Sequence, residues 1–283
     1  MSEPASGGIG DTQHPAARVA ATTMVFRSPA LLGKWIDHYG AQLGRANLFI
    51  IAHGPCADHA ALAEGCNLIT IPRRFDARID VDKAAILSHQ CALLLSAYDG
   101  VICGDVDELV AVDPALGPGL AEYVAALPKD AIVAPVGLNV MPHSRYFERP
   151  PPRVDLAAPL LAQCNRMSLA SHFSKPAVLK APARFAAGQH TLGEGTFTLD
   201  DNLALFHLKY LALNDATYYR DLAQGVRTAA EATGRPVRQR LWARGAEGLK
   251  EMAARLDGTD DTRVSTPREE ARQLSMAPVS PGD

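Results

Sequence analysis

Three carboxylates lie within four consecutive positions of the stretch YDGVICGDVDELVAVDP, which runs from Tyr98 to Pro114. They belong to Asp105, Asp107 and Glu108. Carboxylates drawn close together repel one another and lose hydration, so a positive group must offset them. A bound cation is the leading interpretation, and oxygen ligands of this kind favour Mg²⁺ or Mn²⁺ over a softer metal.

The acidic group follows the apolar residues of a segment, 100–110, that we expect to be a buried strand. On an extended strand, side chains two residues apart face opposite ways, so Asp105 and Asp107 converge only if the chain turns there. Gly104 permits such a turn. In a parallel sheet, ligands bind outside the carboxyl ends of the strands, and that is where these carboxylates fall.

The elements that must position this group alternate between strand and helix. We expect strands at 18–26, 46–54, 67–73 and 100–110, and helices at 28–43, 57–65 and 80–98, with Ser28 as N-cap and Pro29 in the first turn. Extended segments follow at 131–142, 177–186 and 195–211, and two helices at 214–232 and 235–256. The pattern predicts an α/β fold: a mixed, mostly parallel, Rossmann-like sheet with helices on both faces and a C-terminal helical extension.

Composition limits the class of protein. The chain has 283 residues, of which 47% are hydrophobic, and it has a formal net charge of -3, which gives no broad basic field for nucleic acid. Residues 1–16 and 257–283 are polar and rich in small residues, so we expect tails around one domain at 17–256. Five scattered cysteines favour reduced thiols, and no stretch reaches the roughly 20 apolar residues of a membrane span. We expect a cytoplasmic protein without a transmembrane segment, with peripheral attachment to a membrane left open.

The chain contains the segment FRSPALLGKWIDHYGAQLGRANLFIIAHG, followed later by GVICGDVDELV. In the order of these two segments it resembles nucleotide-sugar glycosyltransferases of the GT-A fold. It is most similar to the family-2-like and family-92-like bacterial group, over residues 24–210. The D-x-D-E element of that group binds a divalent cation and the diphosphate of the donor, which places Asp105, Asp107 and Glu108 in those roles. Where relatives carry an Asn-Glu pair this chain has Arg27 and Ser28, and where they carry Asn or Asp after the second strand it has His53 and Gly54.

The resemblance also implies roles for residues outside the acidic element. A late histidine of the group falls on His207, as a third metal ligand beside Asp105 and Asp107, although a core histidine bonded to a backbone carbonyl explains the residue equally well. An SKP element places Lys175 near the ligand phosphates. Arg27, Lys83 and His190 are further candidates for contact with the substrate, set against ordinary surface roles.

Transfer with inversion needs a base that takes the acceptor proton. Asp107 and Glu194 are the catalytic candidates, Glu194 because it lies in a loop between glycines. The second half of the chain offers other carboxylates that nothing in the sequence separates from Glu194: Glu148, Asp155, Asp200 and Asp201. Loops at 141–153 and 188–195 have the length and composition to cover a sugar.

The sequence therefore predicts a Mn²⁺- or Mg²⁺-dependent glycosyltransferase. It would move a sugar from a UDP- or GDP-linked donor to a saccharide, lipid or protein acceptor. A nucleotidyltransferase of the same fold and a non-catalytic nucleotide-sugar binding module are the alternatives. No G-x-S-x-G, Walker, HExxH or G-x-G-x-x-G motif is present, which argues against hydrolase, P-loop, zincin and dinucleotide-binding functions.

Overall fold

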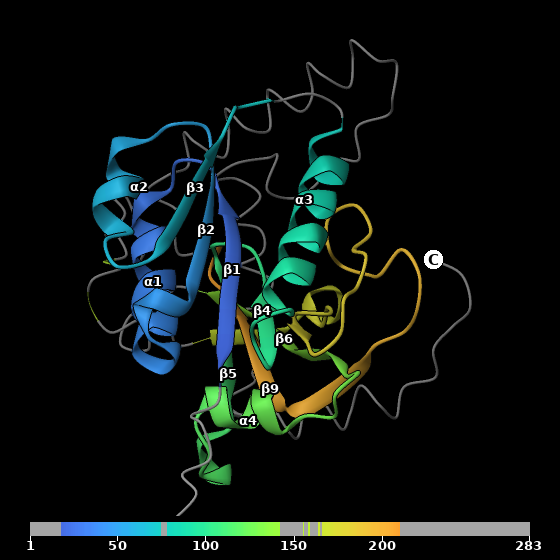
Figure 1. The fold of residues 1–283 in the computed structure, drawn as a ribbon. Coiled ribbons are helices and arrows are strands. Elements are labelled where there is room, and N and C mark those ends of the chain that lie inside the picture. The colour runs from blue at the N-terminus through green and yellow to red at the C-terminus, as the bar shows by residue number, and fades with distance from the viewer. Residues whose placement is uncertain are drawn as a thin grey trace, which may run out of the picture.

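A curled sheet with helices on both faces forms the centre of the computed structural model (Figure 1). The structure describes residues 18–74, 78–141, 155, 158, 164 and 166–209. The helices are α1 (Pro29–Leu43), α2 (Ala57–Leu62), α3 (Ile79–Leu94) and α4 (Leu120–Ala126). The strands are β1 (Val19–Val25), β2 (Leu48–His53), β3 (Asn67–Ile71), β4 (Gly100–Cys103), β5 (Glu108–Val112), β6 (Ile132–Met141), β7 (Arg166–Leu169), β8 (Val178–Leu179) and β9 (Thr198–His207).

The strand order is β3-β2-β1-β4-β8-β6-β9-β5, with β7 paired to β6. The half that contains β3, β2, β1 and β4 is parallel, and its successive strands are connected through helices, as parallel strands require. The other half is mixed: β8 is antiparallel to β4 and β6, β9 is parallel to β6, and β5 is antiparallel to β9. The prediction of a mixed α/β sheet is confirmed, and the arrangement is consistent with a Rossmann-like GT-A fold.

Two hydrophobic layers hold the helices to the sheet. Successive residues of β1 point to opposite faces, so Val19 and Ala21 pack with α1 and α4, whereas Ala20 and Met24 pack with α3. The N-terminal helix α1 contributes Trp35, whose side chain is 1% exposed. In Figure 1 the helices α1 and α2 lie on one side of the sheet and α3 on the other.

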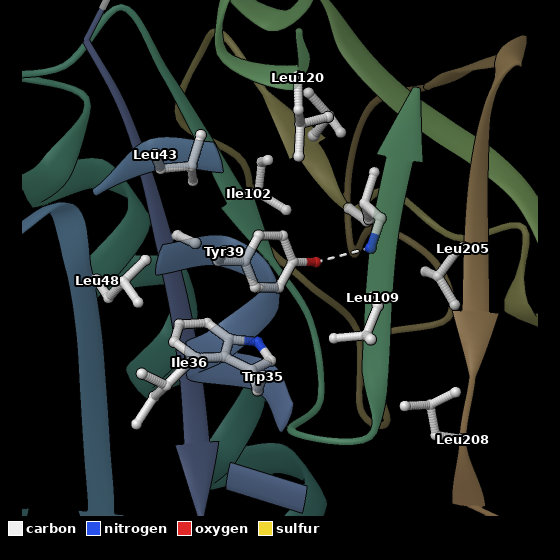
Figure 2. Packing of buried hydrophobic residues seen from close by; sticks show 14 of the residues in the cluster. Trp35, Ile36, Tyr39, Leu43, Leu48, Ile102, Leu109, Leu120, Leu205 and Leu208 are labelled. Atoms are coloured by element: carbon white, nitrogen blue, oxygen red, sulfur yellow. Dashed lines mark hydrogen bonds between the residues drawn. The ribbon is translucent and has the colours of Figure 1, made fainter. Parts of the chain in front are cut away.

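Helix α1 also fixes the position of β5, the strand that follows the acidic residues. The Tyr39 hydroxyl accepts a hydrogen bond from the Val110 amide at 2.8 Å, a contact drawn in Figure 2, and His38 Nε2 lies 2.8 Å from the Val110 carbonyl oxygen. Because the Tyr39 side chain is buried, this polar contact is shielded from water. The middle of β5 is therefore tied to α1, the helix that follows β1.

Several sequence predictions differ from the structure in detail. Residues 100–110 form two strands rather than one, because the chain leaves β4 after Cys103 and reverses before β5. Ser28 stands before α1, but its side chain makes no capping bond, since its backbone is in the left-handed region with φ 53°. The predicted segment 177–186 contains only the short β8. The tails, the C-terminal helical extension and residues 142–153 of the predicted loop 141–153 lie outside the described residues, whereas Met141 is the last residue of β6.

Candidate functional site

The acidic residues lie at the edge of the sheet where β4, β6 and β9 end. Asp105 and Asp107 follow β4, His207 is the last residue of β9, and Asn139 lies near the end of β6. Since β6 and β4 are both antiparallel to β8, they run in the same direction, and β9 is parallel to β6. The topology therefore brings these side chains to one edge, as predicted for Asp105 and Asp107.

A tight turn joins Asp105 to Glu108 through two reciprocal hydrogen bonds. The Glu108 amide donates to the Asp105 carbonyl at 3.0 Å, and the Asp105 amide donates to Glu108 Oε2 at 2.8 Å. The glutamate reaches back three residues to an amide, as the glutamate of a helix capping box does, but here it closes a turn between two strands. Gly104 lies against it, since a Cβ there would come within 3.0 Å of Glu108 Oε2. The turn expected at Gly104 is present.

Two lysines supply the positive charge that the carboxylates require. The Lys83 ammonium donates a hydrogen bond to Asp105 Oδ1. Lys175 Nζ lies 2.8 Å from Glu108 Oε2 and 3.7 Å from Asp105 Oδ2. Burial acts to raise the pKa of Asp105, but the charges of Lys83 and Lys175 together hold it well below its ordinary value. Asp105 is therefore ionised, with an ammonium group facing each of its oxygens.

The cluster has an outer and an inner layer. The side chains of Asp105 and Lys83 are 32% and 25% exposed, whereas those of Glu108 and Lys175 are each 1% exposed. Burial raises the pKa of Glu108 to about 7, although the Lys175 charge opposes this shift. For Lys175 burial acts in the opposite sense, but Glu108 and Asp105 raise its pKa above the ordinary value. A ligand would meet Lys83 and Asp105, while Glu108 and Lys175 support them from below.

His207 lies beside Asp107 with its imidazole held on two sides. Its Nδ1 is 2.8 Å from Asn139 Oδ1, its Nε2 is 3.6 Å from Asp107 Oδ2, and its ring stacks on Phe173 with the centroids 3.8 Å apart. Burial lowers the pKa of His207 to about 4, although the Asp107 charge opposes this shift. The imidazole is therefore neutral near pH 7, the form that can coordinate a metal or accept a proton.

The segment that carries Phe173 and Lys175 is packed tightly against β6. Gly137 donates its amide hydrogen to Ser174 Oγ at 2.9 Å, and a Cβ at Gly137 would come within 2.4 Å of the Phe173 backbone. Only a glycine admits so close an approach. His190 lies near this segment as well: its Nδ1 is 2.7 Å from the His172 carbonyl oxygen, and its ring centroid is 5.7 Å from that of Phe173.

The structure thus brings together six of the predicted site residues: Lys83, Asp105, Asp107, Glu108, Lys175 and His207. His190 approaches the same cluster through Phe173. Arg27 lies at the end of β1 beside Phe26, apart from these contacts. Glu194 is exposed on its loop, and among the described residues no contact joins it to the cluster. Its proposed role as a base stays a prediction.

The expected metal ligands are only partly assembled. Within the described part of the chain, no group of three or more His, Cys, Asp or Glu side chains is arranged to hold a metal ion. Asp107 and His207 face each other, but Asp105 is engaged by Lys83 and Lys175. A cation could join all three ligands only if Lys83 moved away from Asp105, because the two positive charges compete for one carboxylate. The metal requirement stays a prediction.

Sequence reasoning missed two members of the cluster, Asn139 and Phe173. Asn139 stands in an apolar strand, where a buried amide needs a partner, and that signal was available at Leu138–Val140. Phe173 lies two residues before Lys175 in an irregular segment, and nothing in its local sequence indicates contact with His207. Both act on His207, one by a hydrogen bond and the other by stacking.

None of the helices in the described residues has the length and apolar character of a membrane span.

Comparison with protein-family models gives no match, and no curated protein matches the sequence. Among solved structures, an apo structure of the bifunctional glycosyltransferase WbbM is 14% identical and has a TM-score of 0.25. That alignment covers 49% of this chain and 24% of WbbM, so the chain spans about a quarter of that protein.

A second solved structure is the mannose-1-phosphate geranyltransferase from Thermus thermophilus. It is 12% identical, with a TM-score of 0.27, and the alignment covers 84% of this chain and 67% of the other. We infer nothing about activity from similarities at this level.

Proposed function

We propose that the chain is a glycosyltransferase that uses a UDP- or GDP-linked sugar as donor. The observation that carries this proposal is the charged cluster at the carboxyl ends of β4 and β9, where Asp105 lies between two lysines and Asp107 faces His207. Clefts at such edges are the usual ligand sites of α/β sheets. Buried charges that are paired this closely are also typical of functional sites.

Each residue of the outer layer has a proposed role. Lys83 is partly exposed and would contact the donor phosphates, where its charge stabilises the negative charge of the departing diphosphate. Asp105, Asp107 and His207 would hold Mn²⁺ or Mg²⁺, which would supply further stabilisation of that charge. The phosphates would draw the Lys83 ammonium group away from Asp105. The Asp105 oxygen that accepts the hydrogen bond from Lys83 would then be free to bind the metal ion.

The inner layer keeps the outer residues in position. Glu108 holds the Asp105 amide and Lys175 balances both carboxylates, while Asn139 and Phe173 fix the imidazole of His207. Fixed dipoles and charges lower the cost of reorganisation during a reaction. Glu194 is our candidate for the base that takes the acceptor proton, and the acceptor is a saccharide, lipid or protein hydroxyl.

A thermal-shift screen of UDP, GDP and their sugar conjugates, with and without Mn²⁺, would identify the donor, because a ligand that binds the folded state raises the melting temperature. Release of nucleoside diphosphate from the donor should then be measured, with Asp107→Asn as the blank. Asp37→Asn is the matched control, since Asp37 is exposed on α1.

Slow release without acceptor is expected, because water can take the place of the acceptor. Tight donor binding with no release above the Asp107→Asn blank, with or without acceptors, would favour a binding module. Pyrophosphate as product would favour a nucleotidyltransferase. Either result would contradict the glycosyltransferase proposal.

A further inference from the structure

The two end strands of the sheet differ in what lies against their outer sides. The strand order places β5 at one end and β3 at the other (Figure 1). At β5 the backbone of Val110 is occupied by α1, since its amide donates to the Tyr39 hydroxyl and His38 Nε2 lies 2.8 Å from its carbonyl oxygen. At β3, in the described part of the chain, β2 is the only strand alongside. An open edge of this kind is a template for pairing with another strand.

The hydrogen bonds between β2 and β3 show which backbone groups of β3 lie on its outer side. The Gly54 amide donates to the Ile71 carbonyl at 2.9 Å, so Ile71 turns its backbone groups toward β2. Because the direction alternates along a strand, Ile69 also faces β2, whereas Leu68 and Thr70 direct their N–H and C=O groups away from it. Among the described residues, none forms a backbone hydrogen bond with these outward groups.

The side chains of β3 do not protect this edge. The strand has the sequence NLITI and carries no charge. Ile69, at its centre, is 47% exposed, and Asn67 and Thr70 are exposed as well. Edge strands that avoid association usually carry charged side chains, but here the nearest charged residues, Glu64 and Arg73, lie outside the strand.

The strand is also held in place before any partner binds. The side-chain amide of Asn67 donates to the carbonyl oxygens of Ala46 and Leu48 at 2.8 and 3.1 Å. In the turn before the strand, Arg45 Nε donates to the Glu64 carbonyl at 2.8 Å. A preorganised edge loses little conformational freedom on association, so more of the interaction energy appears as affinity.

We infer that the outer side of β3 is a dimer interface, where β3 of a second copy pairs antiparallel about a two-fold axis through Ile69. Residues equally far before and after Ile69 then face each other, so Leu68 of one copy faces Thr70 of the other. These residues exchange both of their outward hydrogen bonds. The two Ile69 residues form a non-hydrogen-bonded pair with Cα atoms about 4.5 Å apart, and their exposed side chains come into contact.

The charges that flank β3 favour a second copy over a different protein as the occupant. Glu64 lies five residues before Ile69 and Arg74 five residues after it, and both side chains are exposed. In the antiparallel dimer Glu64 of each copy therefore lies near Arg74 of the other, at both ends of the interface. A second copy thus supplies a strand of matching length, an apolar centre and complementary charges.

Pairing at β3 is independent of the proposed function. The strands of the second copy run in the opposite direction, so its carboxylate cluster lies at the opposite edge of the extended sheet. Each site stays open and complete within its own chain. Variants that abolish the dimer should therefore leave nucleoside diphosphate release per chain unchanged, and a dimer that releases none would contradict only the transferase.

Sedimentation velocity of the full chain, from about 1 to 300 µM, should show a reversible equilibrium between monomer and dimer. Thr70→Pro should weaken the dimer about tenfold or more, because it removes one outward N–H from each copy and leaves the bonds to β2 intact. Ile69→Lys should weaken it at least as much, since two like charges then lie directly opposite. Leu199→Lys is the matched control: Leu199 is 42% exposed on β9, away from β3 in the strand order, and its replacement should change the affinity less than about twofold.

Glu64→Arg and Arg74→Glu test the register of the two strands. Each variant alone should dimerise several-fold more weakly, on the order of three- to tenfold, because like charges meet at both ends. An equimolar mixture should recover the affinity of the wild type, since every charge at the ends then faces its opposite. A general loss of folding cannot produce this recovery, and thermal unfolding of each variant confirms that it is folded.

A chain that stays monomeric at about 300 µM would overturn the inference and leave the edge to a strand of another protein. A dimer as stable as wild type in both Thr70→Pro and Ile69→Lys would overturn it as well, because the interface would then lie elsewhere. The same conclusion would follow if mixing Glu64→Arg with Arg74→Glu gave no recovery.

Discussion

Glu108 and Lys175 form an ion pair that is closed to water, with Nζ and Oε2 2.8 Å apart and each side chain 1% exposed. Removing one partner of such a pair leaves a buried charge without compensation. Lys175→Met should therefore lower the free energy of unfolding by about 3–5 kcal/mol. Glu108→Gln should cost less, because a glutamine oxygen can still accept from the Asp105 amide and Lys175 keeps Asp105 as a neighbour.

Denaturant unfolding measures both variants, with Lys129→Met as the control for loss of an exposed lysine. Asp82→Asn is the control for the carboxylate, since the Asp82 side chain is 45% exposed and its pairing with Arg78 is in contact with solvent. The controls should change stability by less than about 1 kcal/mol. A Lys175→Met variant as stable as wild type would show that the pair does not hold the turn.

The pH dependence of stability should carry two opposing contributions from the cluster. Folding raises the pKa of Glu108 from 4.5 to about 7, so its contribution is complete below pH 4.5 and is lost as pH rises through 7. Folding lowers the pKa of His207 from 6.5 to about 4, so its contribution is complete above pH 6.5 and is lost as pH falls through 4. Between these limits the two slopes have opposite signs and largely cancel.

Single variants should separate the two contributions. In Glu108→Gln, stability should rise with pH between 4 and 6.5, with a limiting slope of about 1.4 kcal/mol per pH unit for one proton. In His207→Gln, stability should fall as pH rises from 4.5 to 7. Denaturant unfolding at each pH in EDTA gives these slopes. If stability depends on pH in both variants as it does in the wild type, then folding neither raises the pKa of Glu108 nor lowers the pKa of His207.

Two glycines should respond in opposite ways to the same substitution. Gly137→Ala places a methyl group 2.4 Å from the Phe173 backbone and 2.6 Å from the Ser174 amide, so the segment that carries Lys175 must move. We expect a loss of about 3 kcal/mol. Gly33→Ala, inside α1, meets only Leu62 at 3.8 Å and should stabilise by about 0.5–1 kcal/mol through helix propensity. Thermal unfolding of both variants tests this contrast, and a tolerated Gly137→Ala would contradict the packing described.

The parallel half of the sheet could be predicted because its signals are local. Apolar runs such as Leu48–Ala52, separated by helical periodicity, require strands covered on both faces. The location of Asp105 and Asp107 followed from the rule for ligand sites in such sheets. The pairing of β5 with β9 could not be predicted in the same way, since it joins Glu108 to His207 across 99 positions, and no local pattern specifies that register.

The source of positive charge at the site was harder to predict than the location of the carboxylates. Lys83 lies in a helix and Lys175 in an irregular segment, and each is an ordinary surface lysine when only its neighbours in sequence are considered. The fold buries Lys175 because the Ser174 side chain and Gly137 fix its segment against β6. Repulsion among carboxylates correctly required a cation, but electrostatics alone does not distinguish an ammonium group from a metal ion.

Competition between Lys83 and a metal ion for Asp105 gives a sharp test of the proposed metal site. If Asp105, Asp107 and His207 ligate Mn²⁺, Asp107→Asn should weaken Mn²⁺ binding, because a neutral amide replaces a charged ligand. Lys83→Gln should strengthen it, by about tenfold if 1.4 kcal/mol of repulsion is removed, since the ammonium that occupies Asp105 is gone. Paramagnetic resonance of free Mn²⁺ measures both affinities, with Asp37→Asn as the control. The same Lys83→Gln variant should bind pyrophosphate more weakly in EDTA, so a general loss of folding cannot produce the pair of results. Mn²⁺ affinity that changes in neither Asp107→Asn nor Lys83→Gln would rule out these carboxylates as ligands and leave the lysines as the cations of the site.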